Sequence, residues 1–493
     1  MARALLLIGL MQFLALLVGV LRQKGLSVFL GPEGLGIVGT IDQIVLLVVQ
    51  LGAFGLPFTA LKFMSQAQGE SAAAFRHVSN RFLRLITLLS VSATLLCGLA
   101  LALWPQLSGP KMAPYTNSLL VAVLGIAPLM IASFLVNVLA SARRPLAGSA
   151  LGLVVAAISA ASAIIGATMG GTIGLYVGST AAGLVTTLGA LVYLDLTEGI
   201  SFFRRPQEQL SADHRTPAIG VTALSVYVTM IAYTGMLLAV RYGVLAVAGE
   251  REAGILHAAL TVSLTAGSLL AAMTALYLAP TLNRLKDAEE KQRHTHMFAG
   301  RILALFMLGA VPLVLFPQLA MTILYTHAFH PSAVLIAGFL VWQCLYQLMN
   351  VYLQLLVGLD EMPFMALAAS TGLCVAAALT VALAGVFGSS TVWIGLSIGA
   401  VLSGGLMIAR LRARHGLRIP PHIIVRLGLL LGAIALGHVL FNPATENTMS
   451  GVAARLTFAL IAFGLLVLQM QNEERALIHG VVTAARRRLG LTA

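Results

Sequence analysis

Long apolar runs follow one another along nearly the whole chain, and they constrain its fold more than any other feature. A bilayer core of about 30 Å needs roughly 20 apolar residues per helix. The 493-residue sequence contains fourteen such runs, at residues 4–30, 35–65, 83–104, 117–140, 146–168, 172–195, 218–246, 254–279, 302–324, 333–357, 364–386, 391–410, 424–441 and 452–470. Strands of a membrane barrel would instead show alternating segments of about 10 residues. The sequence therefore predicts an all-α polytopic membrane protein with about 14 transmembrane helices.

Composition excludes the other broad classes. Charged residues make up only 10% of the chain and hydrophobic residues 59%, whereas an ordinary soluble domain carries about 25% charged residues. A soluble enzyme, a secreted disulfide scaffold and a disordered chain are therefore ruled out. Cys97, Cys344 and Cys374 lie in apolar runs without disulfide or metal spacing, so we interpret them as small buried hydrophobic residues. Residues 1–20 lack a cleavage site followed by a polar segment, so we expect a retained first helix.

The basic residues indicate how the chain is oriented. If the N-terminus is cytoplasmic, 24 of the 30 Lys and Arg residues fall on cytoplasmic segments. Three fall on outer segments, namely Lys111, Arg251 and Arg455. The other three, Arg22, Lys24 and Arg241, lie inside helices. This bias predicts an even number of helices and cytoplasmic termini. It also accounts for the net charge of +13, so no nucleic-acid partner is expected.

An internal repeat divides the chain. Four stretches recur in order at an offset near 218, with one shift of about five residues. Arg22 with Gly36–Val38 corresponds to Arg241 with Gly254–Leu256, and the set Arg76, His77 and Arg84 corresponds to the set Arg293, His294 and Arg301. Leu103–Leu107 corresponds to Leu315–Leu319, and Asn137 ahead of Pro145 corresponds to Gln354 ahead of Pro363. Six helices separate the copies, so both copies have the same orientation. The repeat predicts two pseudo-symmetric six-helix lobes, with the substrate path between them.

The predicted domain boundaries follow from this repeat. Residues 1–210 form the first lobe, residues 218–415 the second, and residues 424–470 the two extra helices 13 and 14. Residues 471–493 form a basic tail with apolar residues at helical spacing. We expect this tail to lie on the anionic inner leaflet, and a helix that docks on a partner is the alternative.

Ionisable residues inside the predicted helices are the first candidates for function, because each costs about 2.5–3.5 kcal/mol to insert. Arg22 lies nine positions before Gly31, the predicted outer end of helix 1. At 1.5 Å per residue it is about 13 Å inside that end. Arg241 has a similar depth in helix 7, Lys24 is slightly shallower, and Asp42 is about 10 Å deep in helix 2.

These four residues have alternative interpretations. Arg22, Lys24 and Arg241 are predicted to form a cationic cavity for a phosphate or pyrophosphate, which an arginine fork matches. The alternative is that Arg22 and Lys24 extend to the outer interface. Asp42 either neutralises Arg22 or Lys24 in an ion pair, or takes up and releases a proton or sodium ion during transport, or is a water-exposed acid without a role.

Four amides form a stripe on the predicted helix 10. They are Gln343, Gln347, Asn350 and Gln354, and their spacing of 4, 3 and 4 puts them on one face. Either they line a hydrophilic cavity and bind sugar hydroxyls, or they form hydrogen bonds between helices. His257 and His438 are lone membrane histidines, for which we expect a packing or interfacial role.

No motif of an enzyme is present. The sequence has no Walker A loop, zinc-ligand cluster or nucleophile elbow. We therefore expect no catalytic residue, no metal site and no cofactor, and any energy coupling to come from a proton, a sodium ion or the membrane potential.

Two stretches resemble a known family. Leu21–Gly36, which reads LRQKGLSVFLGPEGLG, resembles the first-helix signature of Wzx-type O-antigen and lipid-linked oligosaccharide translocases. Val240–Ala246 through Ala253–Ile255 is similar to the same family's seventh helix. This family belongs to the superfamily of multidrug, oligosaccharidyl-lipid and polysaccharide exporters. Many of its members have twelve helices, and this chain has two more, as the lipid II flippases and some polysaccharide exporters do.

The resemblance implies a fold, a substrate and a location. It implies two lobes in a V shape and flipping of an undecaprenyl-pyrophosphate-linked oligosaccharide, by alternating access, from the cytoplasmic to the periplasmic leaflet of a bacterial inner membrane. The membrane lipids and the proteins of polysaccharide polymerisation and assembly are the implied partners. It also implies a cationic central cavity, onto which Arg22 and Arg241 map. The alternatives are a cation-coupled multidrug exporter of the same superfamily and a lipid II flippase. A membrane-embedded polymerase is disfavoured because the predicted outer loops are short.

Overall fold

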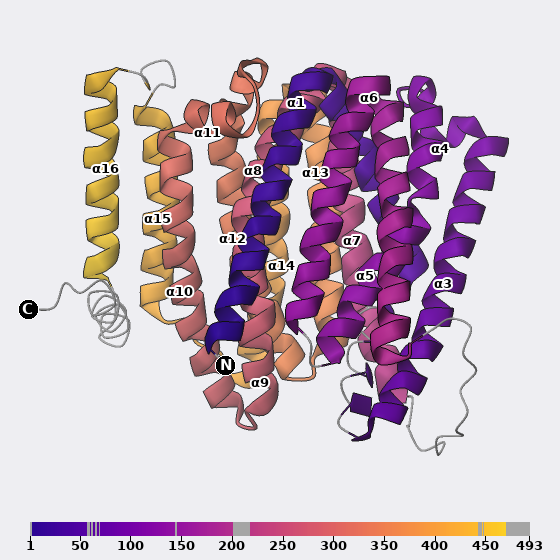
Figure 1. Cartoon of the computed structure of the whole chain (residues 1–493). Helices are drawn as coiled ribbons and strands as arrows, with labels where there is room; N and C mark the ends of the chain where they lie inside the picture. Colours follow the sequence, from indigo (N-terminus) through magenta and orange to yellow (C-terminus); the bar gives the residue numbers. More distant parts are fainter. Residues whose placement is uncertain are drawn as a thin grey trace, which may run out of the picture.

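The protein is a bundle of helices (Figure 1), here in a computed structural model. The structure describes residues 2–200 and 217–469, except for 57–59, 61, 62, 65, 66, 69, 143, 144, 442–445 and 447. No strand occurs among these residues. The predicted tail at 471–493 and the basic segment 201–216 lie outside the described residues.

The bundle contains fifteen α-helices over the described ranges, several of which are parts of one crossing. In the first half of the chain they are α1 (Ala2–Ala53), α3 (Ala72–Leu103), α4 (Thr116–Leu124), α5 (Ile126–Ser141) and α6 (Pro145–Glu198). In the second half they are α7 (Pro217–Ala248), α8 (Glu250–Met273), α9 (Ala279–Arg284), α10 (Ala288–Leu315), α11 (Pro317–Leu324), α12 (Ala333–Gly358), α13 (Met362–Phe387) and α14 (Val392–His415). The last two are α15 (Pro421–Leu440) and α16 (Met449–Leu468).

Twelve described stretches are long and apolar enough to cross a membrane, and two of them, Leu14–Ala53 and Leu146–Glu198, hold two crossings each. The backbone leaves the helical conformation at Gly31 in α1, and at Gly170 and Gly171 in α6. With both stretches divided there, the fourteen predicted crossings are confirmed. We call the end of the bundle where α1 turns the Gly31 face, and the end where the chain begins the N-terminal face (Figure 1).

The repeated sequence stretches have matching backbone conformations. Gly31 has φ 63° and ψ −173°, and its counterpart Gly249 has φ 87° and ψ −179°. Both values lie in a region that favours glycine. Trp104 and Phe316 each precede a proline and have ψ values of 74° and 57°, which end the helix before them. The two halves of the chain therefore turn in the same way at the repeated positions.

Three predicted helices differ in extent from the observed ones. Within the run 35–65 the helix α1 ends at Ala53, and within the run 302–324 the helix α10 ends at Leu315, after which α11 forms a separate helix beginning at Pro317. The run 117–140 is broken at Gly125. Pro128 has no N–H for the carbonyl four residues earlier, and the Thr180 hydroxyl of α6 donates to the Val121 carbonyl at 3.2 Å. Both features interrupt the regular hydrogen bonding of this helix.

The two extra helices, α15 and α16, lie at one edge of the bundle, opposite α3 (Figure 1). Two fully buried arginines belong to their contacts. Arg426 of α15 donates to the Gln469 carbonyl at the end of α16, at 2.7 Å. Arg455 of α16 lies over the rings of Phe316 and Phe441, with 5.9 and 5.5 Å to the ring centroids. The contact with Phe316 ties α16 to the end of α10.

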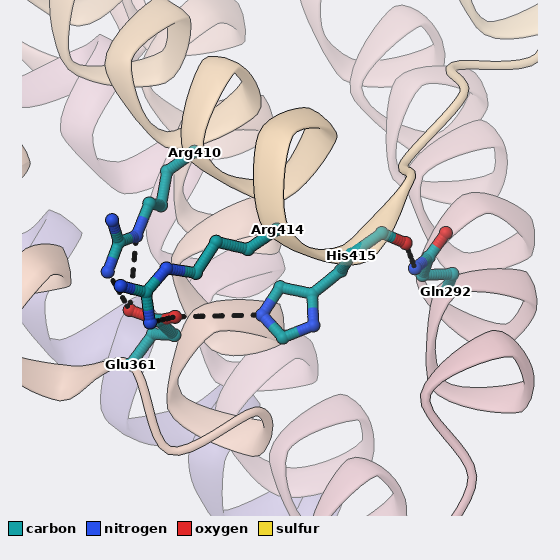
Figure 2. A network of polar contacts seen from close by, with 5 residues as sticks. All are labelled: Gln292, Glu361, Arg410, Arg414 and His415. Carbon is teal, nitrogen blue, oxygen red and sulfur yellow. Dashed lines mark hydrogen bonds and ion pairs between the residues drawn. The ribbon is translucent and has the colours of Figure 1, made fainter.

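A polar network joins three elements of the second half at the N-terminal face (Figure 2). Glu361, in the turn between α12 and α13, accepts from Arg410 at 3.0 Å and from Arg414 at 3.4 Å, both in α14. His415 Nε2 lies 3.7 Å from the same carboxylate, and its carbonyl accepts from Gln292 of α10 at 2.8 Å. Gln292 and His415 also line a cavity of about 1040 Å³ at the ends of α10, α14 and α15. The network fixes these helix ends relative to one another.

Candidate functional site

The two halves of the chain touch at the Gly31 face through a pair of glycines. Gly36 of α1 lies against the backbone of Glu250 and Gly254 in α8, and Gly254 lies against the Pro32 backbone. A Cβ atom on either glycine would overlap these atoms. Pro32 and Gly36 match Glu250 and Gly254 in the repeat, so each half contributes the same two repeat positions. This contact sets the position of the side chains one turn deeper.

Arg241 and His257 form a buried pair at that depth. The Arg241 side chain in α7 contacts His257 Nδ1 in α8, and the two residues are 9% and 6% exposed. Gly39, one turn after Gly36 in α1, leaves room for both, because a Cβ there would overlap the imidazole and the guanidinium. A small residue on one half thus makes space for two nitrogen-rich side chains on the other.

Asp42 lies beside this pair, one turn further along α1. Its carboxylate accepts from the Tyr176 hydroxyl of α6 at 2.9 Å. Asp42 and Arg241 are close enough to interact electrostatically, and so are Tyr176 and Arg22. The Asp42 carboxylate therefore lies within the field of Arg241 and makes its hydrogen bond to a tyrosine.

Arg22 completes the group from the first part of α1. It is half-buried, and it interacts electrostatically with Tyr176 and with His257. The structure thus brings together three of the sequence-predicted residues, Arg22, Arg241 and Asp42. The two arginines come from positions that differ by one residue in the repeat alignment, since Arg22 precedes Gly31 by nine residues and Arg241 precedes Gly249 by eight. The site they share lies between the halves of the chain.

Lys24 has a different position. Its ammonium group donates to the backbone carbonyls of Thr322 and Tyr325, at the C-terminal end of α11. The opposite end of α11 is held by Glu446, whose carboxylate accepts from the Gln318 and Leu319 N–H groups at 3.0 and 2.6 Å. A carboxylate at the start of a helix and a cation at its end both match the helix dipole. Lys24 therefore connects α1 of the first half to α11 of the second.

The amide stripe of α12 lies mainly in a contact between helices. Gln343 and Gln347 are 2% and 3% exposed, and both lie against Gly267 of α8. Gln347 donates to the Gly267 carbonyl at 3.0 Å. Asn350 and Gln354, further along α12, are half-buried. Gln347 thus makes a hydrogen bond between helices, as in the helix-packing alternative, and Gln343 packs against the same glycine.

Aromatic rings link this stripe to the arginines. Tyr346, which forms a side-chain hydrogen bond with Asn350, stacks on Tyr233 of α7 with 5.2 Å between ring centroids. Tyr233 in turn interacts electrostatically with Arg241, as does Tyr325. The stripe and the arginine site are therefore connected through two tyrosines, Tyr346 and Tyr233.

Sequence reasoning missed several members of the site. Tyr176, Tyr233 and Tyr325 carry no pattern that distinguishes them from packing tyrosines. His257 was expected to have only a packing or interfacial role. One sequence signal could have identified His257. It lies three residues after Gly254, the repeat partner of Gly36, and residues one helical turn from this contact face the other half of the chain.

The arrangement is suited to an anion. Arg22 and Arg241 supply two guanidinium groups, Asp42 supplies a carboxylate, and the tyrosines supply hydroxyl groups. A buried guanidinium attracts a phosphate strongly, because water does not screen the interaction. The fold and site thus define a polytopic helical membrane protein with a cationic site between its two halves.

No protein-family model and no curated protein matches the chain. Solved structures do. The lipid II flippase MurJ, in an inward closed conformation, has a TM-score of 0.68 at 13% identity, over 94% of this chain and 98% of that one. A MATE protein in complex with MaL6 has a TM-score of 0.63 at 15% identity, over 84% and 96%. A MOP-superfamily transporter from Pyrococcus furiosus has a TM-score of 0.58 at 15% identity, over 84% and 95%. The chain therefore has the fold of these proteins over nearly their whole length.

Proposed function

We propose that this protein is a flippase for a lipid-linked oligosaccharide. It moves an undecaprenyl-pyrophosphate-linked oligosaccharide from the cytoplasmic to the periplasmic leaflet of a bacterial inner membrane, as part of O-antigen or exopolysaccharide synthesis. The observation that carries the proposal is that Arg22 of the first half and Arg241 of the second half act on the same tyrosine as Asp42. The arginines hold the pyrophosphate, and the polyprenyl chain stays in the lipid.

The charge of the site supports an anionic substrate. A transporter of cationic drugs needs carboxylates to offset the charge of its substrate, and here two arginines act on the same tyrosine as one aspartate. A pyrophosphate offers several oxygens to the two guanidinium forks. Lipid-linked substrates also agree with the fold, because MurJ, described as a lipid II flippase, aligns with 94% of this chain, against 84% for the MATE protein.

We propose alternating access of two lobes, residues 1–210 and 218–415, with the N-terminal face on the cytoplasmic side. In this structure the Gly36–Gly254 contact brings the lobes together at the Gly31 face, which is then the periplasmic side. The Tyr115 hydroxyl also donates across the two halves to Glu250, at 2.9 Å. The pyrophosphate reaches the arginines from the N-terminal face and leaves after the Gly36–Gly254 contact separates. We further propose that Asp42 takes part in coupling to a proton or sodium ion.

Flipping in sealed vesicles tests the proposal. The full chain is reconstituted with a fluorescent undecaprenyl-pyrophosphate oligosaccharide, and the fraction protected from a membrane-impermeant quencher is followed over time. We expect Arg22→Gln and Arg241→Gln each to slow flipping at least tenfold, because each removes a charge-assisted contact with the pyrophosphate. Arg251→Gln, which removes an exposed arginine on the Gly31 face, serves as the control and should flip at the wild-type rate.

Other results would identify another function. If wild-type vesicles do not move this lipid but accumulate cationic dyes in a gradient-dependent manner, the protein is a multidrug exporter. If they move lipid II and not the oligosaccharide lipid, it is a lipid II flippase. Normal flipping by both arginine variants would show that these residues do not bind the substrate.

A further inference from the structure

The contact between Arg241 and His257 determines where the imidazole carries its proton. A guanidinium has five N–H donors and no acceptor, so His257 Nδ1 must accept from Arg241. Nδ1 is therefore unprotonated, and the single proton of the neutral ring is on Nε2. In this structure His257 is a neutral residue held between cations.

Two donors of this pair have no acceptor. Arg241 Nε and His257 Nε2 are both buried and without a hydrogen-bond partner among the described residues. The two side chains that carry them are more than nine-tenths buried. An unsatisfied buried donor costs roughly 1–3 kcal/mol, and two of them on side chains in contact provide hydrogen bonds for an acceptor that arrives between the halves of the chain.

The charged and titratable groups around the site come from α7, α1, α6 and the segment after α11. Arg241 and Tyr233 are on α7, Arg22 and Asp42 on α1, Tyr176 on α6, and Tyr325 follows α11. Of these, Arg241 and Arg22 act on the ring directly. Both place a positive charge beside the imidazole.

A bound pyrophosphate changes this balance. Its charge offsets the two arginines, and it offers Arg241 a stronger acceptor than the imidazole. Once the guanidinium turns to a phosphate oxygen, Nδ1 loses its donor, and its lone pair is free to take a proton from water. The ring then carries protons on both nitrogens and donates to the anion through Nε2.

We propose that His257 is a further binding group for the anionic head group, and that anion binding is linked to uptake of a proton at His257 Nδ1. The inference rests on the proposed function only in that the ligand is a pyrophosphate. By linkage, proton uptake on binding requires that affinity rise as the pH falls. Histidine suits this role because its charge changes near physiological pH.

Calorimetry on the full chain in detergent micelles tests the linkage, with inorganic pyrophosphate as the probe. Titrations at one pH in HEPES and in Tris give the number of protons exchanged, because these buffers have different ionisation enthalpies. The reference is His257→Gln, which keeps an N–H donor but does not titrate. Pyrophosphate's own ionisation is common to both proteins and cancels in their difference.

We expect the wild type to take up between half a proton and one proton more than His257→Gln. The ratio of their affinities should change at least tenfold between pH 6.0 and pH 8.0, in favour of the wild type at the lower pH. His438→Gln, which alters an exposed membrane histidine, should match the wild type in both measurements. If His257→Gln does not fold, as judged by its melting temperature, His257→Asn provides the same comparison.

The possible failures are distinct. Equal proton uptake and equal pH dependence in wild type and His257→Gln would overturn the inference and leave the proposed function intact. No binding of pyrophosphate by the wild type would overturn both. Tight binding by both proteins that is lost in Arg241→Gln would keep the anion site and remove His257 from it.

Discussion

At the scale of single residues, the site depends on a glycine, Gly39, which has no side chain beyond hydrogen. Gly39 faces Arg241 and His257 across the contact between the halves, and nothing larger than hydrogen fits there. The geometry of the anion site is therefore set from the first half, although the pair itself belongs to the second. Asp42 adds a negative charge from the same helix, which offsets part of the cost of burying Arg241.

Gly39→Ala should disable the site without removing any charged group. Its Cβ would overlap His257 and Arg241, and relieving an overlap of this kind in a packed interior costs about 1–3 kcal/mol. We expect pyrophosphate affinity, measured by calorimetry, to fall at least tenfold. Gly19→Ala is the matched control, because Gly19 is also in α1 and has nothing within 4 Å of an added Cβ. Unchanged affinity in Gly39→Ala would mean that the pair does not bind the anion.

At the scale of elements, short polar contacts at helix ends hold the long apolar helices in place. α11 is the clearest case, since Glu446 caps its start and Lys24 its end. These two residues come from opposite ends of the chain, so this eight-residue helix joins α1 to the loop before α16. The turn between α12 and α13 is held in the same way by the network of Figure 2.

The stability that Glu361 provides should depend on pH. Burial of its carboxyl would raise its pKa, but the hydrogen bond from Arg410 and the charges of Arg410, Arg414 and His415 outweigh burial and hold the pKa below the ordinary 4.5. The folded-state pKa is thus lower than the unfolded-state pKa. Ionised Glu361 therefore stabilises the fold above about pH 4.5, and this stabilisation is lost as the pH falls through the folded-state pKa.

Glu361→Gln should accordingly lower the melting temperature at pH 7 and have no effect in stronger acid. The contribution is roughly 1 kcal/mol or less, because water screens a partly exposed ion pair. Thermal unfolding in detergent across pH 3–8 measures it. Glu289→Gln, which alters an exposed acid on the same face, is the control. A difference between wild type and Glu361→Gln that stays constant over this range would contradict the assignment.

Prediction from sequence succeeded for features that depend on length and average polarity. The apolar runs fix the number of crossings, because a bilayer requires a minimum length of helix. The end of α10 at Leu315 depends on the nearby Pro317. The break between α4 and α5 at Gly125 depends in part on Thr180, which belongs to another helix. The site shows the same limit: the repeat put Arg22 and Arg241 at one depth, but the rotation of α8 that brings His257 to Arg241 is decided by packing against Gly36.

At the scale of the whole molecule, the alternating access that we propose requires the halves to separate at the Gly36–Gly254 contact. It involves backbone against backbone, so a larger residue at either position holds the halves apart. Elsewhere the halves also meet along α1 and α7, where Tyr227 donates to the Leu51 carbonyl at 3.1 Å. Opening at the Gly31 face therefore requires the glycine contact to break while contacts nearer the N-terminal face rearrange.

Gly254→Leu should shift the population toward an open Gly31 face. The native cysteines are replaced, and spin labels are attached at Lys111→Cys on the first half and Ser389→Cys on the second half. Double electron–electron resonance then measures the distance between the two labels. We expect a distribution several ångströms longer than in the parent. Gly235→Leu is the control, because Gly235 in α7 has open space around it. An unchanged distribution in Gly254→Leu would show that this contact does not control the opening.

The glycine contact has a further consequence. Pro32 and Gly36 meet Glu250 and Gly254, their own repeat partners, so the surface is self-complementary in the way of a twofold homodimer. A single unit of this kind needs no separate partner, because a second copy of itself offers the matching surface. In such a dimer both subunits have the same sequence, so a single substitution in the contact would change both of its sides. In a single chain that holds both halves this constraint is absent, and the two sides differ: Gly39 and Asp42 on one side correspond to His257 and Leu260 on the other.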